Sequence, residues 1–261
     1  AFLVKNTDHE DWGASMPHGV GAHFYSTLDS TNAFAKEKAE HGERGPIWIV
    51  AGEQSAGRGR SGRNWTSLPG NLYCSLLFAP GIAPNDIAPL PFIVALAVRD
   101  TFVALGASPE AVQCKWPNDV LLNARKTSGI LIESSASGNN IEYLVVGIGM
   151  NLMHHPKDAI FPATNFNAVF GNVPDTRTVM AILADKVKKR LDAWTLGHFE
   201  PIRTEWLSCA WGIGEKRKIR TSGEEFIGTL IGLNGEGAVN VSLDDGTEKT
   251  IYVADIFPSA S

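Results

Sequence analysis

Residues 52–65 read GEQSAGRGRSGRNW and combine four glycines with three arginines, Arg58, Arg60 and Arg63, before a closing tryptophan. Glycine lets the backbone approach a ligand closely, and its N–H groups can cradle anionic oxygens. Arginine adds a permanent positive charge and a planar fork of donors that suits carboxylate and phosphate. This composition predicts a loop that binds an anion with several oxygens, although an RG-rich disordered tail that binds nucleic acid has the same composition.

The segments on either side of this loop decide between the two interpretations. Residues 47–51 (IWIVA) and 72–78 (LYCSLLF) are short and apolar, so each predicts a buried strand. A glycine-arginine loop between two such strands has both of its ends fixed in a folded core. The loop is therefore predicted to form a ligand site.

Polar residues at the start of a predicted helix form a second candidate group. Ser30, Thr31 and Asn32 precede a helix predicted for residues 33–41. All three are good N-cap residues, so simple capping explains them. A helix N-terminus with free hydroxyl and N–H groups is also a polar pocket wall. Gln54, at the end of the strand before the loop, is either a surface residue or a ligand contact.

Two later segments place charged residues beside turns or glycines. In KWPND, Lys115 and Asp119 form a solvated ion pair, or Asp119 binds Mg²⁺ or a ribose hydroxyl. Lys126 stands at the start of a strand predicted for residues 127–133, whose interior Gly129 indicates close approach of a ligand or another backbone. GIGMN, which ends at Asn151, is similar to a nucleotide-binding loop, although G-x-G alone is weak evidence.

Five segments in this order resemble the motifs of biotin protein ligases, and the resemblance spans residue 23 to the end of the chain. They are DSTN at 29–32, GRGRSGRNW at 57–65, KWPND at 115–119, RKTSGILIE at 125–133 and GIGMN at 147–151. The resemblance implies an enzyme that activates biotin with ATP and Mg²⁺ as biotinyl-5'-AMP. It also implies transfer of the biotinyl group to a lysine of a biotin carboxyl carrier protein.

The resemblance also implies roles for individual residues. The expected biotin contacts are Ser30, Thr31, Asn32, Gln54, Arg58, Gly59, Arg60, Lys126 and Gly129. The expected ATP or adenylate contacts are Arg60, Arg63, Trp65, Asn118, Asp119, Lys126 and Asn151, with Asp119 also a candidate Mg²⁺ ligand. Arg58, Arg60 and Lys126 are the predicted catalytic residues, because a carboxylate and a phosphate must meet. Trp65 and Trp116 are either core aromatics or flat walls for a ligand ring.

The predicted fold is α+β, with a catalytic domain over residues 1–210 that has a mixed sheet and packed helices. The resemblance makes it similar to class II synthetases. Hydrophobic periodicity predicts an apolar helix over 86–105 and a helix over 177–196 capped by Thr176, followed by another through Trp206. Residues 161–171 are expected to form a loop, and residues 1–20 an arm on the surface.

A second domain is predicted for residues 211–261, where the period changes to alternation. Short strands are expected at 216–221, 225–233, 237–243 and 247–255, separated by turn residues. This spacing suggests a small SH3-like barrel, and no motif within it marks a catalytic residue. Whether the barrel touches ATP stays open at this stage.

Composition limits the partners. The net charge of −5 argues against a general nucleic-acid binder, and no uninterrupted apolar run is long enough for a membrane span. Three isolated cysteines argue against disulfides and zinc and fit a reducing cytoplasm. Because the motifs begin by Asp29, no DNA-binding domain is expected before them. The oligomeric state stays open, with a homodimer as one option.

Two alternative functions remain at this point. A lipoate–protein ligase would share the fold and the adenylation chemistry, although the motifs fit the biotin enzymes better. A non-enzymatic nucleic-acid-binding protein would use the glycine-arginine loop and the small barrel.

The glycine-arginine loop is also predicted to be mobile without ligand, because its arginines repel one another until an anion arrives.

Overall fold

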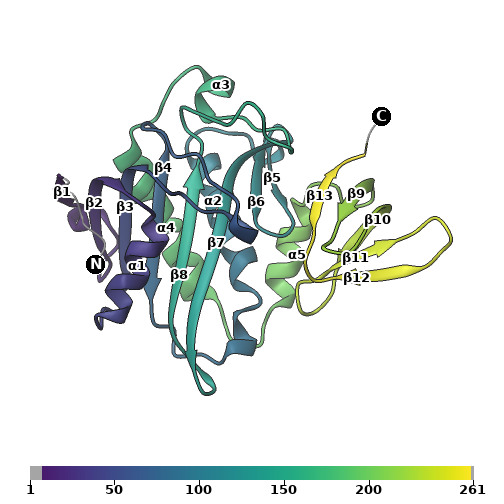
Figure 1. Ribbon diagram of the computed structural model, residues 1–261, viewed down its shortest axis with the longest axis horizontal. Coiled ribbons are helices and arrows are strands. Elements are labelled where there is room, and N and C mark those ends of the chain that lie inside the picture. The colour runs from purple at the N-terminus through teal and green to yellow at the C-terminus, as the bar shows by residue number, and fades with distance from the viewer. Residues whose placement is uncertain (1–7, 260–261) are drawn as a thin grey trace.

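The computed structural model describes residues 8–259 and contains two β-sheets flanked by helices (Figure 1). The larger sheet has eight strands in the order β1-β2-β3-β4-β8-β7-β6-β5. Only β2 and β3 run parallel, and every other neighbouring pair is antiparallel. The strands are β1 His9–Asp11, β2 Gly21–Leu28, β3 Ile47–Gln54, β4 Leu72–Phe78, β5 Val112–Lys115, β6 Asp119–Leu122, β7 Arg125–Ser137 and β8 Asn140–Met150.

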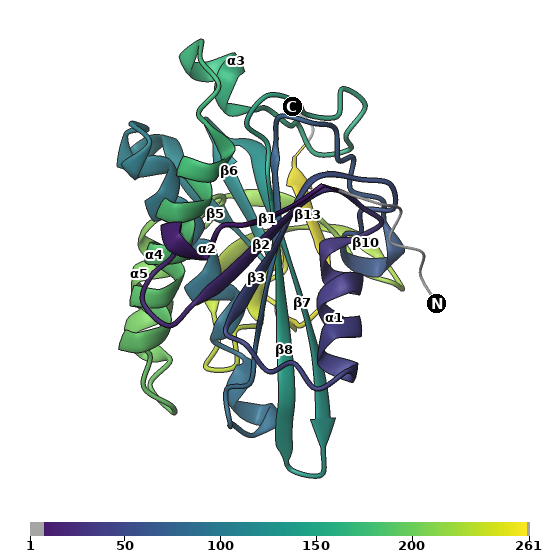
Figure 2. The same ribbon diagram turned by 90° about the vertical axis from the view of Figure 1, so that its left-hand side faces the viewer.

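Helices cover both faces of this sheet (Figure 2). Helix α1 (Thr31–Glu40) packs on one face against β3, β4 and β8. The opposite face carries α2 (Leu90–Ala104), with α4 (Thr176–Ala193) and α5 (Glu200–Ser208) packed against α2. Short 3-10 turns occupy Gly13–Ser15, Arg60–Gly62, Pro84–Ile87 and Pro109–Ala111. The mixed sheet with packed helices confirms the predicted fold class.

Helix α2 is the most apolar element of the chain. Together with the turn before it, Pro84–Ala104 is a 21-residue helical segment with a mean hydropathy of 1.7 in its most apolar window. By length and composition alone it could cross a membrane. However, 56% of that window is buried within the protein, as is typical of a core helix. The structure therefore gives α2 a place in the core, packed against both the sheet and α4.

Several predicted elements differ from the structure. Gly147–Met150, expected in a loop, completes strand β8, because Gly147 and Gly149 pair in register with both neighbouring strands. Residues 161–171 include a short helix, α3 (Phe166–Phe170). The cap of α4 is Asp175, whose carboxylate accepts from the backbone N–H of Thr178 at 2.9 Å.

The predicted N-terminal arm is also wrong where the structure describes it. Residues 9–11 form the edge strand β1, and Trp12 is buried and stacked on Phe24. The remainder of that prediction, residues 1–7, lies outside the described residues.

The second sheet has five antiparallel strands in the order β12-β11-β10-β9-β13. They are β9 Lys216–Arg220, β10 Glu225–Leu233, β11 Val239–Ser242, β12 Glu248–Ile251 and β13 Asp255–Pro258. The strand predicted for 247–255 is therefore two strands, separated at residues 252–254. The SH3-like classification and the boundary at residues 210 and 211 stay predictions.

The two sheets are joined by buried polar contacts as well as by a continuous apolar core. The indole N–H of Trp116, which is 4% exposed, donates to the carbonyl of Gly237 at 2.9 Å. The backbone of Cys114 accepts from Trp211 at 2.8 Å, just before the second sheet begins. Trp116 is therefore a core aromatic that connects the sheets.

Replacing Trp116 with phenylalanine should lower the free energy of unfolding by about 1–3 kcal/mol, because the buried carbonyl of Gly237 loses its donor. Urea unfolding measures the change. Trp194→Phe is the matched control, since its buried indole N–H has no hydrogen-bond partner among residues 8–259. Equal costs for the two substitutions would contradict a stabilising role for the Trp116 hydrogen bond.

Candidate active site

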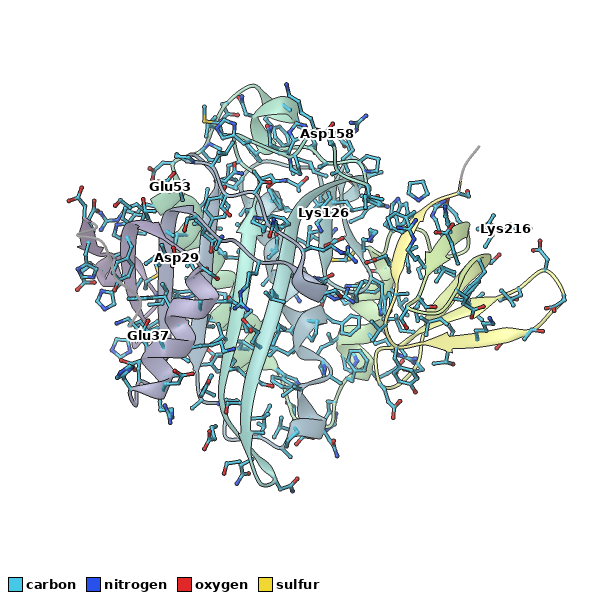
Figure 3. All side chains as sticks on the ribbon, in the orientation of Figure 1. Asp29, Glu37, Glu53, Lys126, Asp158 and Lys216 are labelled. Carbon is cyan, nitrogen blue, oxygen red and sulfur yellow. The ribbon has the colours of Figure 1, made fainter. Side chains whose placement is uncertain are left out.

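A cleft with about 830 Å³ of empty space, partly open to solvent, lies beside β7 and β8. Its walls come from the N-terminus of α1, the glycine-arginine loop, the β5–β6 turn and β13 of the second sheet. A concave site lined by a few convergent polar groups is typical of small-molecule sites. Lys126, labelled in Figure 3, lies at the start of β7, between Asp29 near α1 and Lys216 of the second sheet in that view.

Two glycines form the floor of the cleft. Gly129 of β7 and Gly149 of β8 face each other in register across the two strands. The indole of Trp65 covers them closely. A Cβ built on Gly129 would lie 2.8 Å from the indole, and one built on Gly149 would lie 2.5 Å from it. A side chain at either position would therefore push Trp65 away. A ligand ring that uses this floor must share it with the indole.

Charge is concentrated on one side of the floor. Asp119, 6% exposed, forms ion pairs with Lys115 (Nζ to Oδ2, 3.2 Å) and with Lys126 (Nζ to Oδ1, 2.8 Å). Burial alone would raise the pKa of the Asp119 carboxyl, but the two ammonium groups outweigh it and hold that pKa below its ordinary value. Lys126 is the more exposed of the two lysines and lies 5.3 Å from the centre of the Trp65 ring.

Each arginine of the loop has a partner on a different element. Arg58 donates to Glu133 at 3.0 Å, Arg60 donates to the Asn118 side chain at 3.1 Å, and Arg63 pairs with Asp255. The three arginines therefore have partners before any anion arrives, although the charge of Arg63 still disfavours that of Arg60. Mobility of the loop without ligand stays a prediction. Burial lowers the pKa of Arg60, opposed by Asp119 and Asp255. An incoming anion would exchange partners with these groups.

The start of α1 forms the wall opposite the lysines. Ser30 caps the helix by accepting from the backbone N–H of Ala33 at 3.3 Å, and it also lines the cleft. The backbone N–H of Thr31 donates to the side-chain oxygen of Gln54 at 2.8 Å. This segment therefore both caps α1 and lines the cleft, so the two interpretations offered by the sequence hold together.

The structure brings nearly all the predicted site residues to this cleft. Those that line it are Ser30, Thr31, Asn32, Gln54, Arg58, Gly59, Arg60, Arg63, Trp65, Asn118, Asp119, Lys126 and Gly129. Asn151 does not line it: it is 3% exposed, and its side-chain amide donates to the carbonyl of Thr164 at 3.2 Å. Trp116 does not line it either.

Some lining residues were not predicted as site residues, and they include Asn64, Lys115, Gly149 and Asp255. The sequence indicated Lys115 only as an ion-pair partner of Asp119. The glycines at alternate positions, Gly147 and Gly149, were the sequence signal for the floor, but their pattern predicted a loop instead of a strand. For Asp255, 192 residues beyond Arg63, the local sequence carried no signal.

The residues present do not fit a protein-held Mg²⁺. Both carboxylate oxygens of Asp119 are engaged by lysines. Within residues 8–259, no group of three or more His, Cys, Asp or Glu side chains is arranged to hold a metal ion. Asp119 is therefore the partner of two lysines and not a Mg²⁺ ligand.

Comparison with known proteins identifies relatives of this chain. Residues 24–151 match the biotin/lipoate A/B protein ligase family. The chain is 37% identical over 238 residues to a biotin–[acetyl-CoA-carboxylase] ligase of Paracoccus denitrificans, covering 88% of this chain and 97% of that protein. It is 33% identical to the bifunctional ligase/repressor BirA of Bacillus subtilis, covering 91% and 74%.

Solved structures agree as well. The biotin protein ligase of Aquifex aeolicus in complex with biotin and ATP superposes with a TM-score of 0.77 at 27% identity, covering 91% of this chain and 99% of that one. The ligase of Leishmania major in complex with biotinyl-5-AMP gives a TM-score of 0.64 at 27% identity, covering 91% and 100%. The chain therefore belongs to the biotin protein ligases of the biotin/lipoate A/B protein ligase family.

Proposed function

We propose that the cleft activates biotin with ATP as biotinyl-5'-AMP and transfers the biotinyl group to a lysine of a biotin carboxyl carrier protein. The observation that carries the proposal is the meeting of Lys126, the arginine loop and the aromatic-covered glycine floor in one cleft. A ring-bearing acid needs the floor, and a carboxylate and a phosphate need the cations. The names of the related ligases support biotin as the acid.

The first half-reaction joins two anions. A carboxylate oxygen of biotin attacks the α-phosphorus of ATP, and the bond to pyrophosphate breaks. Such a reaction is accelerated mainly by placement and by compensation of charge. Lys126 is the best-placed group, because it reaches the cleft from the strand that carries Gly129 and is held by Asp119 at 2.8 Å. We assign Arg58 and Arg60 to the same task from the loop side.

The second half-reaction consumes the mixed anhydride. The neutral ε-amino group of the acceptor lysine attacks the carbonyl carbon, AMP leaves, and the nitrogen loses a proton to give an amide. Water must be kept from the anhydride until the acceptor arrives. We assign this task to the loop, which closes one side of the cleft through Arg60 with Asn118 and Arg63 with Asp255. We assign Trp65, Asn118 and Asp119 to the nucleotide side.

The partners follow from this chemistry. The acceptor is the biotin carrier domain of a carboxylase such as acetyl-CoA carboxylase, which is the substrate named for the relative from Paracoccus denitrificans. We place the reaction in the cytoplasm, where three free thiols stay reduced. Neither nucleic acid nor a membrane has a part in the proposal.

Offering the protein ATP with biotin or with lipoate tests the choice of acid. The expected product is biotinyl-5'-AMP, detected by mass spectrometry, with little or no lipoyl-5'-AMP. A preference for lipoate would overturn the proposal and favour the lipoate ligase alternative.

Lys126→Ala should reduce adenylate formation at least a hundredfold, because the carboxylate and the α-phosphate lose the cation between them. Pyrophosphate release measured in a single turnover reports the rate. Lys189→Ala, an exposed lysine on α4 paired only with Asp185, is the control and should keep the wild-type rate. If Lys126→Ala forms the adenylate at a near wild-type rate, the assignment of this lysine is wrong.

Arg60→Gly should make the adenylate more slowly, because one compensating cation is lost, and should release what it makes roughly ten- to a hundredfold faster, since a charge-assisted contact contributes about 1.5–3 kcal/mol. Released adenylate would biotinylate lysines of bystander proteins. Mixing the variant with ATP, biotin and albumin, followed by a streptavidin blot, detects this labelling. Unlabelled albumin, while adenylate is still being made, would show that the loop does not retain the intermediate.

A further inference from the structure

A buried serine that does not line the cleft connects two residues that do. Ser75 of β4 is fully buried, and its hydroxyl oxygen lies 2.7 Å from Oγ1 of Thr31 and 2.6 Å from Oδ1 of Asn32. A hydroxyl carries a single proton, so Ser75 can donate to only one of these two atoms. The direction of donation decides which hydrogen-bonding groups the wall of the cleft presents.

The orientation of the Asn32 amide is fixed by its other neighbours. Nδ2 lies 2.9 Å from the carboxylate of Glu133 and 3.2 Å from the carbonyl of Leu131, and both of these groups only accept hydrogen bonds. Oδ1 therefore faces Ser75. Because a carbonyl oxygen cannot donate, Ser75 must give its proton to Asn32.

Thr31 must then donate its hydroxyl proton to Ser75. The Thr31 hydroxyl then has no proton to give to the side-chain oxygen of Gln54, which lies 3.2 Å away. That oxygen is still satisfied, because it accepts the backbone N–H of Thr31 at 2.8 Å. The amide nitrogen of Gln54 donates to Ser67 at 2.9 Å, which agrees with this orientation of Gln54. The proton of the Thr31 hydroxyl is thus used inside the protein, and only its lone pairs can serve a ligand.

We propose that Ser75 is a positioning residue that fixes the Thr31 hydroxyl as a hydrogen-bond acceptor, so that the cleft selects a substrate ring bearing an N–H donor. The cyclic urea of biotin has two such N–H groups. The inference rests on the proposed function, since it concerns how that substrate is recognised. Without the Ser75 oxygen, the Thr31 proton is no longer fixed: it can turn to the ligand or to the Gln54 side-chain oxygen 3.2 Å away, so the preference of the wall for an N–H donor weakens.

Binding of biotin and of biotin methylated at a urea nitrogen, each measured by calorimetry without ATP, tests the proposal. Each of the two nitrogens is methylated in turn. The wild-type protein should bind biotin much more tightly than the analogue methylated at the nitrogen that faces Thr31. Ser75→Ala should weaken biotin binding about tenfold and reduce that discrimination by a similar factor. The KM for ATP should not change.

Matched variants separate positioning from loss of stability. Thr101→Val on α2 also removes a buried hydroxyl hydrogen bond, to the carbonyl of Ala97 at 2.9 Å, and should lower the Tm without changing biotin binding. Ser75→Cys places a somewhat larger group that donates and accepts only weakly, so its affinity should lie between wild type and Ser75→Ala. In a Thr31→Val background, Ser75→Ala should add almost nothing to the loss of affinity.

Two results would overturn the proposal. One is wild-type affinity and discrimination in Ser75→Ala, with only a lower Tm like that of Thr101→Val. The other is a full additional loss of affinity when Ser75→Ala is made in the Thr31→Val background. Failure of the proposed function is recognised separately, because the wild-type protein would then form no biotinyl-5'-AMP from biotin and ATP.

Discussion

The cleft depends on one pair of residues without side chains. Gly129 and Gly149 face each other across β7 and β8. Their lack of a Cβ lets the indole of Trp65 lie directly on the sheet. The position of Trp65 in turn fixes the end of the glycine-arginine loop, and its ring lies 5.3 Å from the ammonium of Lys126. A methyl group on Gly129 or Gly149 would displace Trp65 and so disturb the floor, the loop and Lys126 together.

Charge compensation is the second constraint on the cleft. One buried carboxylate, Asp119, holds two lysines, while Glu133 and Asp255 each hold an arginine of the loop. The cations are thereby placed before any substrate arrives, which lowers the cost of gathering like charges in a partly buried space. An anion that binds here must replace the carboxylates that already pair with these cations. The net free energy of anion binding is therefore smaller than the number of cations suggests.

Local signals in the sequence predicted most of the fold, and the resemblance to biotin protein ligases supplied thirteen of the site residues that line the cleft. The apolar strands, the helix stops and the glycine-arginine loop each follow from neighbouring residues. Residues whose role depends on distant pairing were missed. Gly149 was attributed to a loop because its partner Gly129 belongs to another strand, and Asp255 gave no signal because its partner Arg63 lies 192 residues earlier. Asn151 was overestimated, since its amide is used by the backbone of Thr164.

The contact between Arg63 and Asp255 has a consequence for how the protein is made. A chain leaves the ribosome from its N-terminus, and domains generally fold in the order of their synthesis. The glycine-arginine loop emerges early, yet the carboxylate that holds Arg63 belongs to β13, the last strand of the second sheet. A nascent chain that has already formed the large sheet can therefore hold the loop through Arg58 and Arg60, but not yet through Arg63. Completion of the second sheet is thus the step at which a newly made molecule gains the last of the three arginine contacts that hold this loop.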